Sequence, residues 1–205
     1  MLITAIEPRR KRLTALFLDG ELAVKLDTET LLQSGWKTGM EIDDEALHTL
    51  IQQSDARRAQ EKALYLLEHR SHSKKELADK ISRSASWEAA EKAAQRMEDL
   101  GLVDDERYAH SLAAELLGRK HYAARRAEYE LLQKGIDREL ARACIEEFAA
   151  DPEESLREVI ERKYLRSLAD EKGHRRVFAA LQRLGYSGED IRKVLRDYIE
   201  YENED

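Results

Sequence analysis

Apolar residues recur with a helical period along most of the chain. From about residue 57 onward, apolar side chains return every three or four positions, as they do on the buried face of an amphipathic helix. The pattern is clearest in three stretches, Ala109–Leu117, Leu156–Tyr164 and Ile191–Ile199. It predicts a long helical body in which each helix buries one face.

The first 56 residues follow a different pattern. Three short apolar runs typical of β-strands cover Leu2–Ile6, Leu13–Leu18 and Leu22–Leu26. The Asp19-Gly20 pair between the last two runs predicts a two-residue hairpin turn, because these residue types accept positive φ angles. Asp27 then begins a helical turn that Gly35 ends, and Asp43 is placed to cap a following helix. We expect a small antiparallel sheet that needs cover from the helical body.

Helix start and stop signals agree with the apolar period. Predicted N-terminal caps are Ser73 with Glu76, Asp151 with Pro152 in the first turn, and Ser187 with Asp190. Predicted helix ends are Gly101, Gly135 and Gly185, each followed by a bulky apolar residue. These signals divide the body into helices of ordinary length.

The stops and starts repeat along the chain. When Gly135 is aligned with Gly185, a shift of 50 residues places Leu131 on Leu181 and the Arg125-Arg126 pair on Arg175-Arg176. One inserted residue then places Leu140 and Ala143 on Ile191 and Val194. A further shift upstream brings Ile81 and Lys75 into the same alignment. Three units of about 50 residues are typical of stacked helical repeats.

The sequence therefore predicts a mainly α fold of tandem three-helix repeats in an elongated, curved array, with a small N-terminal antiparallel β-rich extension. We expect the extension over residues 1–56. The three repeats are expected over residues 57–108, 109–150 and 151–205, the last with an acidic tail, Glu200–Asp205. Such an array presents surface for a partner and no deep pocket.

Composition and charge narrow the class of function. Charged residues make up 38% of the chain, and the formal net charge is −7. No section is a polycation, because residues 1–56 are acidic and the other sections are neutral or acidic. Coating of duplex DNA requires many Lys and Arg, so this composition disfavours that role. The lone Cys144 and the absence of a leader-like or membrane-spanning segment indicate a cytoplasmic protein.

Residue patterns for catalysis or cofactor binding are not found. No glycine-rich phosphate-binding loop is present in the sequence. The neighbouring His69 and His72 span a predicted helix end and its cap, a placement that does not favour a metal site. Cys144 shares an apolar stripe with Leu140 and Phe148, which favours a buried hydrophobic residue over a nucleophile. We therefore expect no enzyme activity, no cofactor and no metal.

A basic residue recurs at the same position of each predicted unit and is a candidate for a functional role. Lys75, Arg125 and Arg175 lie near the start of the second helix of successive units, two residues before an apolar position. Two residues turn a helix by about 200°, so these side chains should point outward. With Arg126 and Arg176 they form a candidate contact row for an acidic protein surface or for phosphates. The alternative is an ordinary solvated face, as charged helix surfaces usually are.

Two motifs carry a resemblance to a known family. Leu67–Leu77 fits the opening Leu-x-x-Arg-x-x-Ser-x-x-Glu-Leu of RecX regulatory proteins, and Gly101–Ala109 is similar to their Gly-Leu-x-Asp-Asp-x-x-Tyr/Phe-Ala junction. The second and third units keep the same order with Lys134-Gly135-Ile136 and Gly185-Tyr186-Ser187. The resemblance covers about residues 57–200, whereas the N-terminal extension looks like one that only some members carry.

The resemblance implies a regulator of the bacterial recombinase RecA. Such a protein would lie in the groove of the RecA filament on single-stranded DNA and inhibit its recombinase, ATPase and coprotease activities, with weak or no binding to DNA alone. The implied protein modulates DNA repair and the SOS response, and we expect it to act as a monomer. We expect Lys75, Arg125, Arg126, Arg175 and Arg176 to supply part of the groove contact. Two other readings stay open: a helix-turn-helix-like nucleic-acid-binding protein and a helical scaffold for another client.

Overall fold

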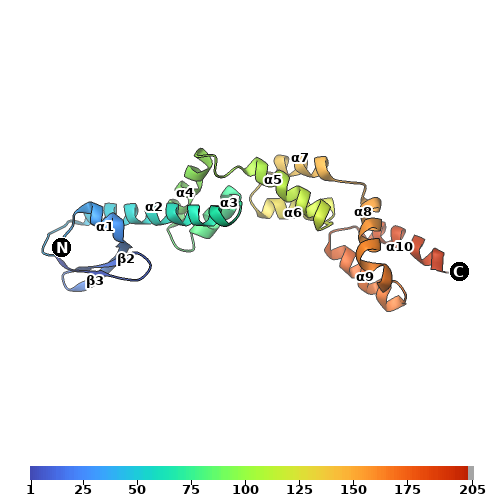
Figure 1. Cartoon of the computed structure of the whole chain (residues 1–205), viewed down its shortest axis with the longest axis horizontal. Helices are drawn as coiled ribbons and strands as arrows, with labels where there is room; N and C mark the ends of the chain where they lie inside the picture. Colours follow the sequence, from blue (N-terminus) through green and yellow to red (C-terminus); the bar gives the residue numbers. More distant parts are fainter. Residues whose placement is uncertain (203–205) are drawn as a thin grey trace. The chain divides into compact units, whose positions relative to one another are not determined.

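The computed structural model describes the backbone of residues 1–202 and the side chains of residues 1–198. The chain divides into two compact units, Met1–Asp104 and Asp105–Asp205 (Figure 1). The first unit contains β1 (Ile3–Pro8), β2 (Leu13–Leu18), β3 (Glu21–Asp27), α1 (Thr28–Ser34), α2 (Asp44–His69), α3 (Lys74–Ile81) and α4 (Trp87–Asp99). The second contains α5 (Asp105–Ala114), α6 (Ala124–Gln133), α7 (Arg138–Phe148), α8 (Pro152–Val159), α9 (Glu171–Arg183) and α10 (Gly188–Glu202).

The N-terminal extension is an antiparallel sheet in the order β1-β2-β3. The predicted hairpin turn forms between β2 and β3, with φ angles of 50° at Asp19 and 90° at Gly20. Asp27 and Asp43 cap α1 and α2 as expected, because their side chains accept hydrogen bonds from backbone amides in the first turns. One face of the sheet packs on α1 and α2 around Leu16, and this core is separate from those of the helical domains.

Helix α2 belongs to two parts of the first unit. Its first half covers the sheet with Leu47, Leu50 and Ile51, and its second half contributes Ala59 and Ala63 to the core formed with α3 and α4. The helix therefore runs without a break through residue 57, where the sequence predicted the end of the extension. The extension and the first three-helix domain share a helix.

Each group of three successive helices encloses its own apolar core. The first core joins α2, α3 and α4, the second joins α5, α6 and α7, and the third joins α8, α9 and α10. Leu77, Leu131 and Leu181, on the second helix of each group, are completely buried. The predicted mainly α fold, with three-helix units and a small N-terminal sheet, is confirmed. The curvature of the array stays a prediction.

The internal alignment of the units needs one correction. Ala143 is exposed, whereas Ala141, Cys144 and Ile145 are the buried residues of α7. These align with the buried residues of α10, Ile191, Val194 and Leu195, at a shift of 50 without any insertion. The insertion predicted between the second and third units is therefore wrong. It lies between the first and second units, where the capping residues Ser86 and Asp137 are 51 positions apart.

The first helices of the second and third domains end in the same unusual way. Helix α5 continues into a π-helical turn at Glu115–Arg119, and α8 continues into one at Ile160–Tyr164. A π-helical turn holds an extra residue and shifts the side chains that follow it around the helix. The side chains of Ile199 and of the predicted acidic tail, Glu200–Asp205, lie outside the described residues.

Candidate interaction surface

The candidate surface is built on the second helix of each domain, and two of these helices begin with a side-chain cap whereas α6 does not. The Ser73 hydroxyl accepts a hydrogen bond from the Glu76 amide at the start of α3, as the capping box predicts. Asp170 does the same for the Gly173 amide at the start of α9. Helix α6 has no side-chain cap at Ala123. Instead, the Ala123 amide donates to the carbonyl of Leu184, at a distance of 2.9 Å, from the end of α9.

The predicted contact residues lie on these helices as expected. Lys75, Arg125, Arg175 and Arg176 are all exposed. Lys75 pairs with Asp79 at 3.2 Å and Arg175 with Glu171 at 2.5 Å. Arg125 and Arg176 have no ion-pair partner among the described side chains. Exposed pairs within a helix contribute little to stability, so these four cations are available to a partner.

Arg126 differs from the other four because it is part of the packing between the second and third domains. Its guanidinium carbon lies 5.7 Å from the ring centres of both Tyr122 and Tyr129, and its Nη2 pairs with Glu130 at 2.6 Å. Gly185 sits directly on its backbone: a Cβ added to that glycine would lie 2.4 Å from the Arg126 Cβ. Arg126 therefore holds the end of α9 against α6.

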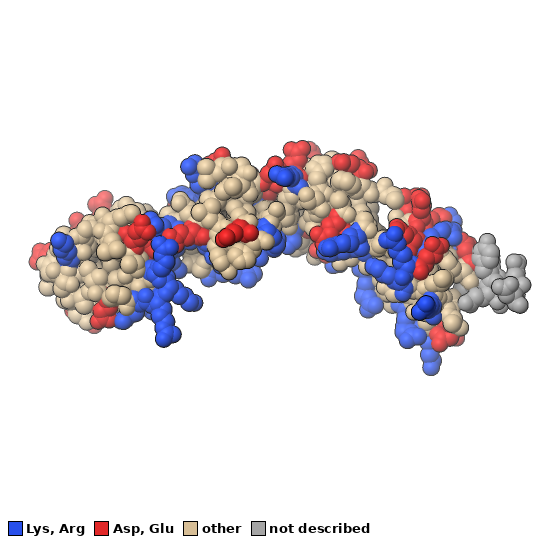
Figure 2. All heavy atoms as spheres, in the orientation of Figure 1, with Lys and Arg blue, Asp and Glu red and all other residues tan. Residues whose placement is uncertain are grey.

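The structure separates the predicted residues into groups. Lys75 lies in the first unit, whereas the four arginines lie in the second. The C-terminal end of α9 contacts α6, and Arg175 lies nine residues before Leu184. At 1.5 Å per residue this is roughly 13 Å along the helix. On the face of each unit drawn in Figure 2, Lys and Arg lie among Asp and Glu, so this face carries no continuous basic surface.

A cavity of about 370 Å³ lies between the second and third domains. Its lining includes His121, Arg125, Glu158 and Tyr186. The Tyr186 hydroxyl donates to the carbonyl of His121 at 3.2 Å, and burial raises the pKa of Tyr186 to about 12. The His121 backbone has a positive φ of 56°, and burial lowers the pKa of its ring. Nothing in the local sequence pattern pointed to this residue, because its role depends on a neighbouring domain.

In this cavity the phenol of Tyr186 stays protonated at neutral pH, because its pKa is raised and its hydroxyl already donates to His121. Elsewhere, Cys144 is buried, and desolvation raises the pKa of its thiol, so it packs as a small apolar residue. No group of three or more His, Cys, Asp or Glu side chains is arranged to hold a metal ion in the part of the chain that the structure describes. Within the same part, no helix has the length and apolar character needed to cross a membrane.

Comparison with known proteins connects this architecture to one family. Residues 104–145 match the model of RecX, second three-helix domain, and residues 151–195 match that of RecX, third three-helix domain. The regulatory protein RecX of Caldanaerobacter subterraneus is 32% identical over 167 residues, which cover 80% of this chain and 84% of that protein. RecX of Clostridium tetani is 24% identical over 200 residues, covering 95% of this chain and 92% of that protein.

Solved structures agree in fold. A crystal structure of regulatory protein RecX superposes with a TM-score of 0.58 at 19% identity, covering 95% of this chain and 98% of that one. RecX from Lactobacillus salivarius gives a TM-score of 0.54 at 20% identity, covering 70% of this chain and 96% of that one. The matched domains, the level of identity and the shared fold lead to one conclusion: the chain belongs to the RecX family of regulatory proteins.

Proposed function

We propose that the protein is a non-enzymatic regulator of the RecA recombinase. It binds the RecA filament on single-stranded DNA and inhibits its recombinase, ATPase and coprotease activities, and so modulates DNA repair and the SOS response. It does so as a cytoplasmic monomer. The observation that carries this proposal is the 32% identity to a RecX regulatory protein over 80% of the chain.

The architecture supports a binding role. Each three-helix domain has its own core, so its surface helices are held in place without help from a ligand. The second helices present Lys75, Arg125, Arg175 and Arg176 to solvent. With a net charge of −7 the chain suits a protein partner better than a long stretch of bare DNA. These four residues, with the guanidinium of Arg126, are the proposed contacts.

Charge reversal tests the contacts without disturbing the fold. In the variant Arg125→Glu/Arg175→Glu, the first position has no ion-pair partner among the described side chains and the second loses only an exposed pair with Glu171. Arg126 is left unchanged because it also packs the domains together. The matched control is Arg138→Glu/Arg196→Glu, which makes the same change of four charges on the exposed faces of α7 and α10.

Binding is measured with RecA assembled on labelled single-stranded DNA, by co-sedimentation of the added protein at moderate salt. We expect the test variant to bind the filament at least about tenfold more weakly than the unmodified protein, which corresponds to about 1.4 kcal/mol. The control should bind within about twofold. Equal binding by all three proteins would show that the contact row is only an ordinary solvated face. No binding by the unmodified protein would refute the proposed function.

A further inference from the structure

The loop between β1 and β2 concentrates positive charge on an otherwise acidic extension. Arg9, Arg10, Lys11 and Arg12 are consecutive and exposed. They are four of the six Lys and Arg residues in the first 56 positions, which also contain ten Asp and Glu. A group of Lys and Arg side chains projects from the first unit where the sheet meets α2 (Figure 2). The positive charge of the extension is therefore concentrated in one loop.

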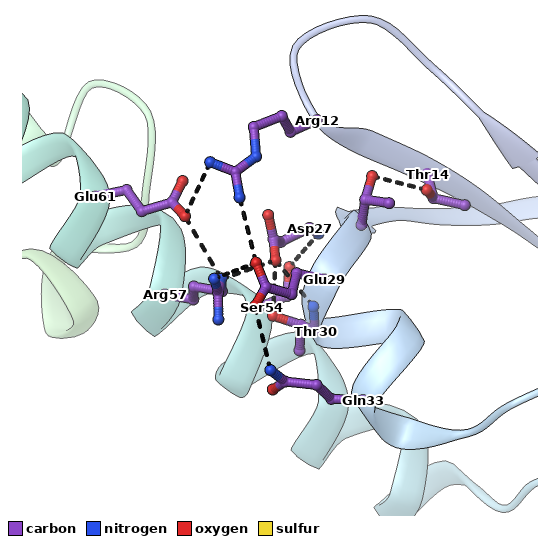
Figure 3. A network of polar contacts seen from close by, with 10 residues as sticks. Arg12, Thr14, Asp27, Glu29, Thr30, Gln33, Ser54, Arg57 and Glu61 are labelled. Carbon is purple, nitrogen blue, oxygen red and sulfur yellow. Dashed lines mark hydrogen bonds and ion pairs between the residues drawn. The ribbon is translucent and has the colours of Figure 1, made fainter.

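The base of the loop forms ion pairs with α1 and α2 (Figure 3). Arg12 lies 3.3 Å from Glu29 and 3.4 Å from Glu61. Arg57 of α2 bridges to Glu29 at 2.5 Å and approaches the buried carboxylate of Asp27 at 3.2 Å. This network joins three parts of the chain, the loop, the start of α1 and the middle of α2. It places the Arg12 side chain beside α1 and α2.

The backbone of the loop is also held in a specific conformation. Lys11 and Arg12 have φ angles of 61° and 59°, a left-handed region that residues other than glycine seldom adopt. The Arg9 amide donates to the Leu13 carbonyl at 2.7 Å, and the Thr28 amide donates to the Arg12 carbonyl at 2.9 Å. Two long cationic side chains are therefore kept where glycine would be less strained.

The loop contains cationic side chains that are free to bind a partner. Arg9 pairs with Glu7 at 2.5 Å, and Arg12 is held by Glu29 and Glu61. Arg10 and Lys11, at the tip, have neither an ion pair nor a hydrogen bond through their side chains within the described part of the chain. Two adjacent cations thus project from a preorganised support, which lowers the entropy that binding must overcome.

We infer that the Arg9–Arg12 loop is a contact for the phosphate backbone of single-stranded DNA. The loop has no apolar side chain between Pro8 and Leu13, so any contact that it makes is ionic. A nucleic-acid strand offers a negative charge at every nucleotide, and the arginine fork fits a phosphate with two hydrogen bonds. A flexible single strand can bring neighbouring phosphates to Arg10 and Lys11 together. This contact goes beyond the proposed function and does not require RecA.

The test uses the whole protein and a fluorescent oligothymidylate without RecA. Anisotropy is followed at about 50 mM salt and then at rising salt. The variant Arg10→Glu/Lys11→Glu removes the free cations and leaves the anchoring Arg12 in place. Its matched control is Lys37→Glu/Arg83→Glu, two exposed cations of the same unit outside the loop. Tryptophan fluorescence and circular dichroism of each variant confirm that the fold is kept.

We expect weak, salt-sensitive binding by the unmodified protein and at least about tenfold weaker binding by the loop variant. Two lost phosphate contacts should also lower the slope of log affinity against log salt by about 1.4, at roughly 0.7 per contact with a single strand. The control should stay within about twofold.

Three results would overturn the inference: no binding by the unmodified protein, an equal loss in the control, or tighter loop-dependent binding to duplex. Displacement of the DNA by polyglutamate at equal charge would assign the loop to an acidic protein instead. Because RecA is absent, these outcomes are independent of the filament experiment.

Discussion

Gly185 is a position where a single added methyl group should destabilise the packing of α9 on α6. The residue has a φ of 99°, and the Cβ of an alanine there would lie 2.4 Å from the Cβ of Arg126. The Cβ of Arg126 is bonded directly to the backbone of α6, so it cannot move away unless the helix moves. Gly185→Ala should cost about 1 kcal/mol for the left-handed backbone and about 2 kcal/mol more for overpacking. Gly101→Ala, at φ 69° with open space around it, should cost only the first amount.

The two units can be followed separately in an unfolding experiment. Trp36 and Trp87 both lie in the first unit, so tryptophan fluorescence reports that unit alone, whereas circular dichroism reports the helices of both. In urea, Gly185→Ala should shift the circular dichroism transition and leave the fluorescence transition in place. Arg126→Gly removes the clashing Cβ, so in that background the same substitution should cost about 1 kcal/mol. Equal losses for Gly185→Ala and Gly101→Ala would refute the close packing of α9 on α6.

Two further predictions concern buried polar groups. Burial lowers the pKa of the His121 ring in the folded protein despite the nearby Glu158. As the pH falls, this histidine is therefore protonated in the unfolded chain before it is protonated in the folded one. Part of the stability present at about pH 7.5 should be lost by about pH 5.5. His121→Asn, which tolerates the positive φ, should reduce that loss in a thermal melt, and an unchanged pH dependence would contradict this assignment. Arg57→Ala removes the ion pair of Asp27, which is only 2% exposed, and should lower the stability of the first unit by about 2 kcal/mol in tryptophan fluorescence. Arg83→Ala, an exposed control, should change it by less than about 0.5 kcal/mol, and equal effects would show that the pair contributes nothing.

Features set by neighbouring residues could be predicted from the sequence. The turn at Asp19-Gly20 and the cap at Ser73 depend on contacts within a few residues, and both form as predicted. The positive φ angles of Gly101 and Gly185 are likewise properties of single residues after a helix end. Local chemistry therefore located these boundaries.

Features that depend on distant residues could not be predicted. The apolar stripe of α2 changes direction because its two halves cover two different cores, which hid the continuity of the helix across residue 57. The π-helical turns overlap the apolar stretches Ala109–Leu117 and Leu156–Tyr164, which the sequence predicted as regular helix. Lys11 and His121 adopt left-handed conformations that their residue types do not predict. The sequence showed that Arg126 occupies a repeated position. Its contact with Gly185 could not be predicted, because it depends on how the third domain packs on the second.

The central claim is that the protein regulates RecA by acting on the filament, and the most direct measurement is the rate of DNA-dependent ATP hydrolysis. RecA is preassembled on single-stranded DNA, and the rate is followed as this protein is added. The account predicts a fall in hydrolysis at concentrations well below those at which the protein coats the same DNA alone. An unchanged rate in large excess of the protein would contradict it, while leaving the three-helix architecture intact.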